Sequence, residues 1–304
     1  MIVIPPTGEQ YEIAADGCAA IVTELGATLR TLTIDGRDVV HGFPVDASPS
    51  GGRGQQLVPW PNRIRDGKYE FEGKTQQLAL TEPARHNASH GLGRHVAWKL
   101  IDQQPNRIRL GLRIYPQPGW PGILEAQLSY AVGADGLSVD VSATNVGPGP
   151  VPFGYGAHPY LTVGEAAVDE VSLTIPAASY LAVDDRLLPT EVRSVEGTDL
   201  DWRVGRQLRS ASLDTAFTDL SRDADGRWEV SVTLGERCSY LWGDANTHWA
   251  QVFTGGPYRN WSIAVEPMTC GPNAFNAGPT HADLIVLQPG ESTSCRWGIG
   301  SRTV

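Results

Sequence analysis

Residues 125–145 read EAQLSYAVGADGLSVDVSATN and carry the clearest structural signal in the chain. In the second half of this stretch, apolar Leu137, Val139 and Val141 alternate with polar residues. A period of two is typical of a β-strand that has one buried and one solvated face. The tripeptide ADG at 134–136 separates two such runs and predicts a tight hairpin. The stretch therefore predicts a pair of antiparallel strands.

Similar runs extend outward in both directions, and more than a dozen of them occur along the chain. Examples are RIRLGLRIY at 107–115, WEVSVTLG at 228–235 and STSCRWGIG at 292–300. No amphipathic pattern exceeds about three helical turns, whereas a parallel α/β fold needs a helix between successive strands. We therefore expect an all-β fold, a large antiparallel β-sandwich with few short helices. Because no linker or internal repeat divides the chain, we expect a single domain over residues 1–304.

The composition narrows the class of protein. The chain has 304 residues, of which 41% are hydrophobic, and this excludes a disordered protein. Its 24 basic and 34 acidic residues give a net charge of −10, which disfavours binding to nucleic acids but still allows a small anion held by a local arginine cluster. Neither a signal peptide nor a membrane-spanning stretch is visible. We expect a soluble, cytoplasmic monomer or homodimer without nucleic-acid or membrane partners.

The cysteines are far apart and form neither a CxxC pair nor a zinc-binding spacing. They are Cys18, Cys238, Cys270 and Cys295. A chain of this length does not depend on disulfide bonds, so we expect reduced and mostly buried thiols.

Four segments interrupt the strand pattern, and the first is VPWPNRIR at 58–65. Its two prolines fix the backbone of a predicted loop. The loop carries Asn62 and Arg63, whose amide and guanidinium groups suit the recognition of hydroxyl groups on a polar ligand. A surface loop with a solvated Arg63 is the alternative.

The second segment, RHNASHGL at 85–92, places His86 and His90 four residues apart. This is the spacing of a helical metal-binding pair, but Pro83 and Gly91 argue against a helix. No acidic residue completes an HExxH pattern either, so we do not expect a metal site. The open alternatives are a histidine that hydrogen-bonds a ligand and one that is satisfied within its own loop.

The third segment, PFGYGAHPY at 152–160, alternates glycine with aromatic residues before His158. Pro159 favours an extended backbone at His158, and the glycines allow a close approach of the main chain. His158 is therefore a candidate functional residue, with a purely structural histidine as the alternative.

The fourth segment, IAVEP at 263–267, ends an apolar run with Glu266. A carboxylate on a buried strand costs free energy unless it is paired or functional. Glu266 is thus the most conspicuous acid in the chain, and a salt bridge within the core is the alternative.

Taken together, these segments resemble the aldose 1-epimerase (galactose mutarotase) family. The similarity covers nearly the whole chain in order. It comprises PWPNRIRDGKYEFEGKTQQL, HNASHGL, PFGYGAHPYL, LDTAFT, AQVFTG and AVEPMTCGPNAFN. The resemblance implies a large antiparallel β-sandwich that interconverts the α and β anomers of a free sugar.

The resemblance also implies roles for individual residues. His158 in GAHPY matches the general acid of the family, and Glu266 in AVEP matches its general base. The positions that match substrate-binding residues are Asn62, Arg63, His90, Asp214 and Gln251, and Tyr160 is expected to line the same pocket. Ring opening requires that the C1 hydroxyl loses a proton and the ring oxygen gains one, which suits a carboxylate and an imidazolium. The resemblance implies neither a metal nor another cofactor.

The identity of the sugar is the least determined point. We expect a neutral hexose such as galactose or glucose. An anionic C6 sugar, a sulfo- or phospho-hexose, is the alternative, because the stretch around Arg85 and Arg94 resembles a bacterial branch that is associated in part with sulfonated sugars. The alternative is that Arg85 and Arg94 are solvated charges at the surface.

Two other functional classes are also possible for such a fold. One is a non-catalytic carbohydrate-binding protein, although binding alone does not require an acid–base pair. The other is a lyase or hydrolase, because fold alone does not determine function. Glycoside hydrolysis usually requires two carboxylates, so a His–Glu pair favours mutarotation.

Overall fold

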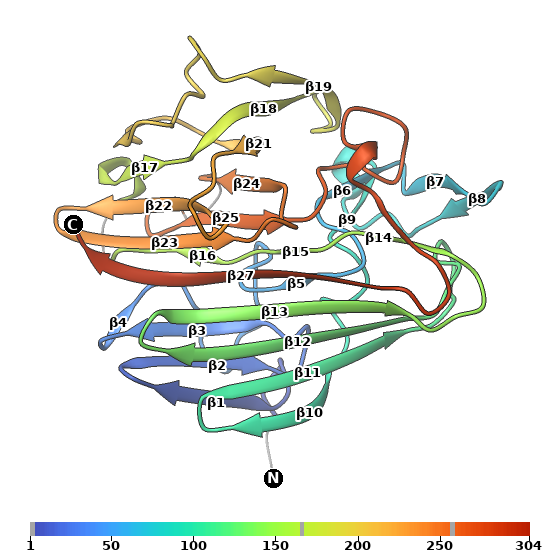
Figure 1. Cartoon of the computed structure of the whole chain (residues 1–304), viewed down its shortest axis with the longest axis horizontal. Coiled ribbons are helices and arrows are strands. Elements are labelled where there is room, and N and C mark those ends of the chain that lie inside the picture. The colour runs from blue at the N-terminus through green and yellow to red at the C-terminus, as the bar shows by residue number, and fades with distance from the viewer. Residues whose placement is uncertain (1–3, 165–166, 256–258) are drawn as a thin grey trace.

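The computed structural model describes residues 4–164, 167–255 and 259–304 and consists of layered β-sheets (Figure 1). No helix in these ranges reaches seven residues. The short 3₁₀-helices are η1 (Pro83–Arg85), η2 (Val168–Glu170) and η4 (His281–Asp283). The predicted all-β class is therefore confirmed. Within the described ranges, no helix is long and apolar enough to cross a membrane.

The predicted hairpin forms at the expected place. Strands β12 (Leu124–Gly133) and β13 (Gly136–Asn145) pair in antiparallel register, with Gly133 opposite Gly136. Burial alternates along both strands, and Val139 and Val141 face the core. The period-two pattern of the sequence thus identified the buried face correctly.

This hairpin lies within a nine-stranded antiparallel sheet that crosses the front of Figure 1. In spatial order the strands are β10 (Lys99–Gln104), β11 (Arg107–Ile114), β12, β13, β27 (Ser292–Thr303), β23 (Arg237–Gly243), β22 (Trp228–Leu234), β17 (Ser172–Thr174) and β20 (Arg206–Gln207).

An eight-stranded antiparallel sheet carries the third and fourth segments that the sequence singled out. Its strands are β19 (Pro189–Ser194), β18 (Ala177–Val183), β21 (Asp214–Leu220), β24 (Trp249–Phe253), β25 (Ile263–Met268), β15 (Gly156–Ala157) and β5 (Gln56–Leu57), and β16 (Tyr160–Leu161) also pairs with β25.

Smaller sheets complete the fold. One contains β1 (Gln10–Ala15), β2 (Cys18–Thr23), β3 (Leu29–Ile34) and β4 (Arg37–Asp38). The two-stranded sheets pair β14 (Val151–Phe153) with β26 (Ile285–Leu287), β6 (Arg63–Arg65) with β9 (Asn87–Ser89), and β7 (Lys68–Phe71) with β8 (Lys74–Gln77).

The large sheets pack face to face around a common core. Strands β1 and β2 contact β11, β12 or β13, and β16 and β25 contact β23. Strands of the other two sheets therefore pack against the nine-stranded sheet at several positions. One hydrophobic cluster extends from Ile13 in β1 to Ile299 in β27. The fully buried tryptophans are Trp98, Trp120, Trp202, Trp228 and Trp297. This packing is the predicted antiparallel sandwich.

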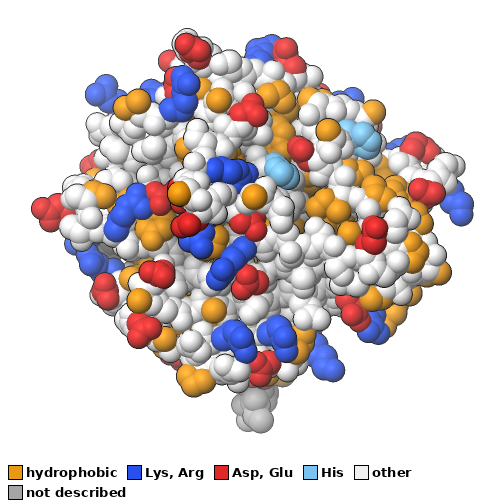
Figure 2. Space-filling view, viewed as in Figure 1, with side chains coloured by type: hydrophobic (Ala, Val, Ile, Leu, Met, Phe, Trp, Pro, Cys, Tyr) orange, Lys and Arg blue, Asp and Glu red, His pale blue; other side chains and the backbone are white. Residues whose placement is uncertain are grey.

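The surface carries charges of both signs, and the cysteines match expectation. Positive and negative side chains are interspersed on the face shown in Figure 2, and no continuous basic stripe crosses it. All four cysteines are free and buried.

Candidate active site

The strand alternation of the eight-stranded sheet creates a polar face. Val265 of β25 and Val252 of β24 belong to the hydrophobic core, so Glu266 and Gln251 point to the opposite side of the sheet. The two residues lie directly opposite each other in the β24–β25 register. A carboxylate and an amide are thereby held side by side on a rigid support.

Strand β21 adds a third polar side chain to this face. Ala216 lies opposite Gln251, so Asp214, two residues away, is a diagonal neighbour of Gln251 on the same side. Gln251 Nε2 donates a hydrogen bond of 2.6 Å to Asp214 Oδ1. Three adjacent strands therefore present Glu266, Gln251 and Asp214 in one row.

His158 lies between β15 and β16, against this row. Its Nε2 is 3.3 Å from Glu266 Oε1, and both side chains are almost completely buried. The Tyr160 ring stacks on the imidazole at a centroid distance of 5.2 Å, and the His90 ring meets it edge-on at 5.6 Å. The imidazole thus has a defined position next to the carboxylate.

Asn62 and His90 are brought together by the β6–β9 pair. Arg63 pairs with Ser89 at the end of this ladder, and the backbone N–H of His90 donates to the Asn62 carbonyl at 2.8 Å. Both Asn62 and His90 have positive φ, 51° and 63°. With these turns, both residues line the same cavity as the polar face of the eight-stranded sheet.

The segment at 58–65 differs partly from the prediction. Residues 58–62 are buried, and Arg63–Arg65 form strand β6 rather than loop. The pairing with β9 satisfies backbone groups that a buried loop would leave without partners. The surface-loop alternative is therefore wrong for this segment. Tyr160 lies in strand β16.

A directional hydrogen-bond chain joins four of the predicted residues. Arg63 Nη1 donates to Asn62 Oδ1 at 3.2 Å, and Asn62 Nδ2 donates to Gln251 Oε1 at 3.3 Å. Gln251 in turn donates to Asp214. The chain begins at a cation and ends at a carboxylate, so every donor and acceptor along it is polarised in one direction.

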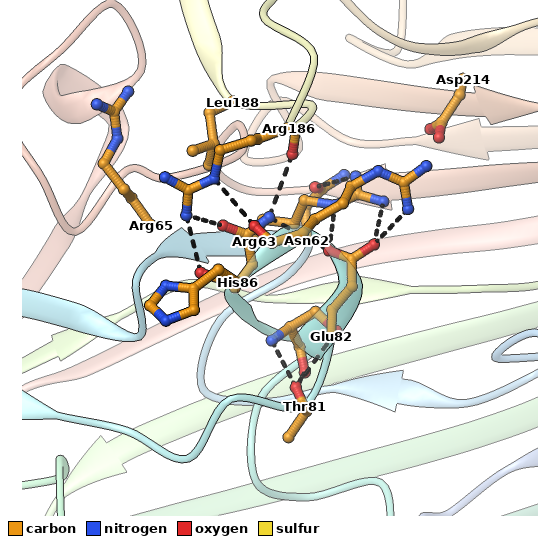
Figure 3. Close-up of polar contacts among 12 residues, drawn as sticks. Asn62, Arg63, Arg65, Thr81, Glu82, His86, Arg186, Leu188 and Asp214 are labelled. Atoms are coloured by element: carbon orange, nitrogen blue, oxygen red, sulfur yellow. Dashed lines mark hydrogen bonds and ion pairs between the residues drawn. The ribbon is translucent and has the colours of Figure 1, made fainter.

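Glu82 is a pocket residue that the sequence did not reveal. Arg63 donates to it through Nε at 2.8 Å and Nη2 at 3.2 Å (Figure 3). Arg85 donates to it through Nη1 at 2.9 Å. Burial alone would raise the pKa of this carboxyl, but the bonds from Arg63, Asn87 and Arg85 outweigh burial and lower the pKa. Nothing in the spacing between residues 63 and 82 indicates this contact in advance.

All eight predicted residues line one cavity of about 470 Å³, a volume in the usual range for small-molecule sites. The complete lining is Gly51, Gly52, Asn62, Arg63, Thr81, Glu82, Arg85, Ser89, His90, Arg94, His158, Tyr160, Asp214, Gln251, Phe253 and Glu266. The chemical groups are mostly polar and match a ligand rich in hydroxyl groups.

Burial disfavours charge at the centre of the site. It lowers the pKa of His158 to about 3, with further contributions from Arg94 and Arg63. Burial also raises the pKa of Glu266 well above its ordinary value, and the negative charge of Asp214 adds to this effect. The pKa of His90 is lowered well below its ordinary value, chiefly by burial. Burial therefore favours a neutral His158 beside a protonated Glu266.

Three buried polar atoms of the site have no hydrogen-bond partner among the described residues. They are Nδ1 of His90, Nδ1 of His158 and Oε2 of Glu266. Buried polar atoms are rarely left unpaired in folded proteins. A ligand with donors and acceptors would satisfy those that face the cavity.

The two histidines of the second segment have different surroundings. His90 lines the cavity, whereas His86 Nδ1 lies 2.9 Å from Asp66 Oδ1 at the surface. Arg186 lies beside His86 (Figure 3). In the described part of the chain, no three His, Cys, Asp or Glu side chains are grouped as a metal site.

Comparison with known proteins identifies relatives that cover almost the whole chain. The family model of aldose 1-epimerase matches residues 9–299. The uncharacterized protein YihR of Escherichia coli is 32% identical over 94% of this chain and 91% of its own length. The aldose 1-epimerase of E. coli is 26% identical over 96% of this chain and 95% of its own.

Structural comparison gives the same fold. The crystal structure of the GalM/aldose epimerase homologue from C. elegans superposes with a TM-score of 0.84 at 22% identity, covering 97% of this chain and 99% of that one. With the match over residues 9–299, the chain belongs to the aldose 1-epimerase family.

Proposed function

We propose that this protein is an aldose 1-epimerase that interconverts the α and β anomers of a free hexose such as galactose or glucose. The observation that carries the proposal is the buried pair of His158 Nε2 and Glu266 Oε1, 3.3 Å apart, in a cavity lined by hydroxyl-binding groups. An acid and a base at this separation can serve the C1 hydroxyl and the ring oxygen of one pyranose.

The proton balance assigns a role to each residue. Glu266 takes the proton of the C1 hydroxyl, the bond between C1 and the ring oxygen breaks, and His158 gives its proton to that oxygen. Rotation about C1–C2 then presents the other face of the carbonyl. In closure His158 takes a proton back and Glu266 returns one, so neither residue is consumed.

Burial favours the ring-opening step. With the closed sugar, the reactive arrangement is protonated His158 beside ionised Glu266. With the open-chain sugar, both side chains are neutral. The low pKa of His158 and the raised pKa of Glu266 both stabilise this neutral pair relative to the charged one. Relative to the charged reactive arrangement, the buried pair therefore favours the transfer of both protons.

The hydrogen-bond chain orients the substrate. Asn62 and Gln251 have their amide groups fixed by Arg63 and Asp214, so they offer defined donors and acceptors to sugar hydroxyls. Binding that holds C1 of the sugar next to His158 and Glu266 aligns the reacting groups.

Polarimetry tests the proposal directly. Freshly dissolved α-D-glucose and α-D-galactose should reach rotational equilibrium faster with the protein than without it, and Glu266→Ala should abolish the acceleration. Wild-type protein that binds either hexose without accelerating its mutarotation would refute the proposal and favour a carbohydrate-binding protein.

One observation favours an anionic C6 sugar as a second candidate substrate. Arg63 and Arg85 both pair with Glu82, whereas Arg94 lines the same cavity without an ion pair to any described carboxylate. Burial lowers the pKa of Arg94, and an anionic substituent would compensate its charge.

A charge-selective comparison separates the two substrates. If the natural sugar is anionic, kcat/KM should be higher for a 6-sulfo- or 6-phospho-glucose than for glucose, and Arg94→Gln should reduce only the former. The matched control is Arg113→Gln, which removes an arginine that pairs with Glu125 at the surface. Equal effects of Arg94→Gln on both sugars would exclude the anionic candidate.

A further inference from the structure

We infer that Gly52 is a positioning residue for His158, because the ring of His158 occupies the space that any other side chain at position 52 would need. An ideal Cβ on Gly52 would lie 2.8 Å from Cδ2 of His158 and 3.2 Å from its Nε2. Real Cβ atoms essentially never approach closer than 3.0 Å. The inference rests on the proposed function, in which Nε2 is the proton donor.

The backbone prevents the two residues from separating. The N–H of Gly54 donates to the His158 carbonyl at 2.9 Å, and the N–H of His158 donates to the Gln55 carbonyl at 3.0 Å. The N–H of Gln55 also donates to the Gly52 carbonyl at 2.9 Å. The carbonyl of Gly54 accepts a hydrogen bond from the Leu29 N–H at 2.9 Å. The turn at 52–55 is thus tied to His158 and to β3.

The imidazole cannot move away easily either. Tyr160 stacks on it with an interplanar angle of 13°, and Tyr160 itself donates through Oη to the Gly51 carbonyl at 2.9 Å. The His90 ring contacts it from the side, and Glu266 lies at Nε2. A displaced ring would therefore lose its alignment with Glu266.

Gly52 meets a second requirement that favours glycine. Its φ is +77°, a region that side chains rarely adopt. Gly226 provides a matched control, since its φ is +75° in a surface turn and no atom lies within 4 Å of the position of its Cβ. Comparison of the two positions separates backbone strain from contact with His158.

The experiment compares Gly52→Ala with Gly226→Ala by polarimetry and thermal denaturation. We expect Gly52→Ala to lower kcat by about 100-fold with little change in KM, because misplacing a reacting group by about 1 Å has an effect of that size. Gly226→Ala should lose only the thermal stability that the positive φ costs and should keep its kcat. Because Asn tolerates positive φ, Gly52→Asn and Gly226→Asn repeat the test if the alanine variant fails to fold.

Wild-type kcat in either variant at position 52, or equal losses of kcat at positions 52 and 226, would overturn the inference. The NMR signals of the His158 ring provide a readout that does not depend on activity. They should shift in the position-52 variants and not in the position-226 variants. If wild-type protein shows no mutarotation, the proposed function fails, and unchanged His158 signals would then overturn the inference separately.

Discussion

In the described part of the chain, two histidine–carboxylate pairs lie within ion-pair distance, and their surroundings are opposite. His158 and Glu266 are 3.3 Å apart, with only 8% and 3% of their side-chain surfaces exposed. His86 and Asp66 are 2.9 Å apart, with 64% and 38% exposed. The shorter contact is thus the one in solvent, and the longer one is at the centre of the polar cavity.

Solvent and neighbouring charges explain why the two carboxyls respond differently. Hydrogen bonds from His86 and Arg186 lower the pKa of Asp66, which remains hydrated. Burial and the charge of Asp214 raise the pKa of Glu266. Water screens the exposed pair, so its interaction is weak whatever its geometry. Proximity of a histidine and a carboxylate is therefore no sign of catalysis unless burial also shifts the pKa values of both groups away from their ordinary values.

The largest expected loss of turnover comes from replacing the ionisable side chains of the buried pair, and the same replacements in the exposed pair are the control. Glu266→Gln and His158→Gln should each lower kcat for hexose mutarotation by about 10³-fold, because each removes one proton transfer. His86→Gln and Asp66→Asn should leave kcat unchanged, because that pair lies outside the cavity. Polarimetry on freshly dissolved sugar measures all four variants.

Circular dichroism must show that the four variants keep the wild-type fold. A loss of turnover in the His86 or Asp66 variant comparable with that in the Glu266 variant would contradict the division between the pairs. Near-normal turnover in Glu266→Gln would remove its role as base.

Asp214→Asn tests the comparison of the two pairs, because it removes a negative charge that acts on Glu266 and not on Asp66. The substitution should raise KM by about tenfold, because a charged hydrogen-bond acceptor for the sugar contributes about 1.5 kcal/mol or more. It should also lower the pKa of Glu266, since the Asp214 charge is one cause of its elevation. Turnover ends when Glu266 is ionised and His158 is neutral, so the alkaline limb of the pH–rate profile should move to lower pH.

Asp66→Asn is the matched control for Asp214→Asn and should leave KM and the alkaline limb unchanged. An unchanged KM in Asp214→Asn would place Asp214 outside the substrate contacts.

The buried pair also predicts a pH dependence of stability. Between pH 6.5 and about 3, an unfolded His158 is protonated and the folded one is not, so stability falls as pH decreases. Above pH 4.5, folded Glu266 keeps a proton that the unfolded residue has lost, so stability falls as pH rises towards the raised pKa of Glu266. Each slope is at most about 1.4 kcal/mol per pH unit.

Denaturant unfolding at a series of pH values measures both slopes as differences from wild type. His158→Gln should flatten the acid side, and Glu266→Gln should flatten the alkaline side. Slopes that remain the same in both variants would show that neither group is perturbed in the folded state.

Residues within regular strands could be predicted well from the sequence. The apolar run around Glu266 indicated a buried strand, and alternation alone places Glu266 and Gln251 on one side of the sheet once their strands are paired. The hairpin at 134–136 formed where its turn residues predicted. In these elements local pattern and tertiary packing require the same arrangement.

Contacts between loops could not be predicted in this way. Glu82 meets Arg63 because β6 pairs with β9, a register that no local pattern encodes. Likewise, the glycine-rich stretch at 51–54 indicates a turn but not that a histidine about a hundred residues later packs against it. Such contacts depend on the arrangement of several sheets, so the sequence indicated the eight expected cavity residues but neither Glu82 nor Gly52.

The smallest expected effect is on stability at the exposed pair. His86→Gln should change the free energy of unfolding by less than about 1 kcal/mol, as is usual for solvent-exposed ion pairs. Arg186 also donates to Asp66 Oδ1 at 2.8 Å and to the His86 carbonyl at 2.9 Å, and these bonds do not require the imidazole. Urea unfolding measures the change, and Arg186→Gln is the informative partner because it removes both bonds. A larger loss in His86→Gln than in Arg186→Gln would mean that the imidazole, and not the guanidinium, holds this loop beside the cavity.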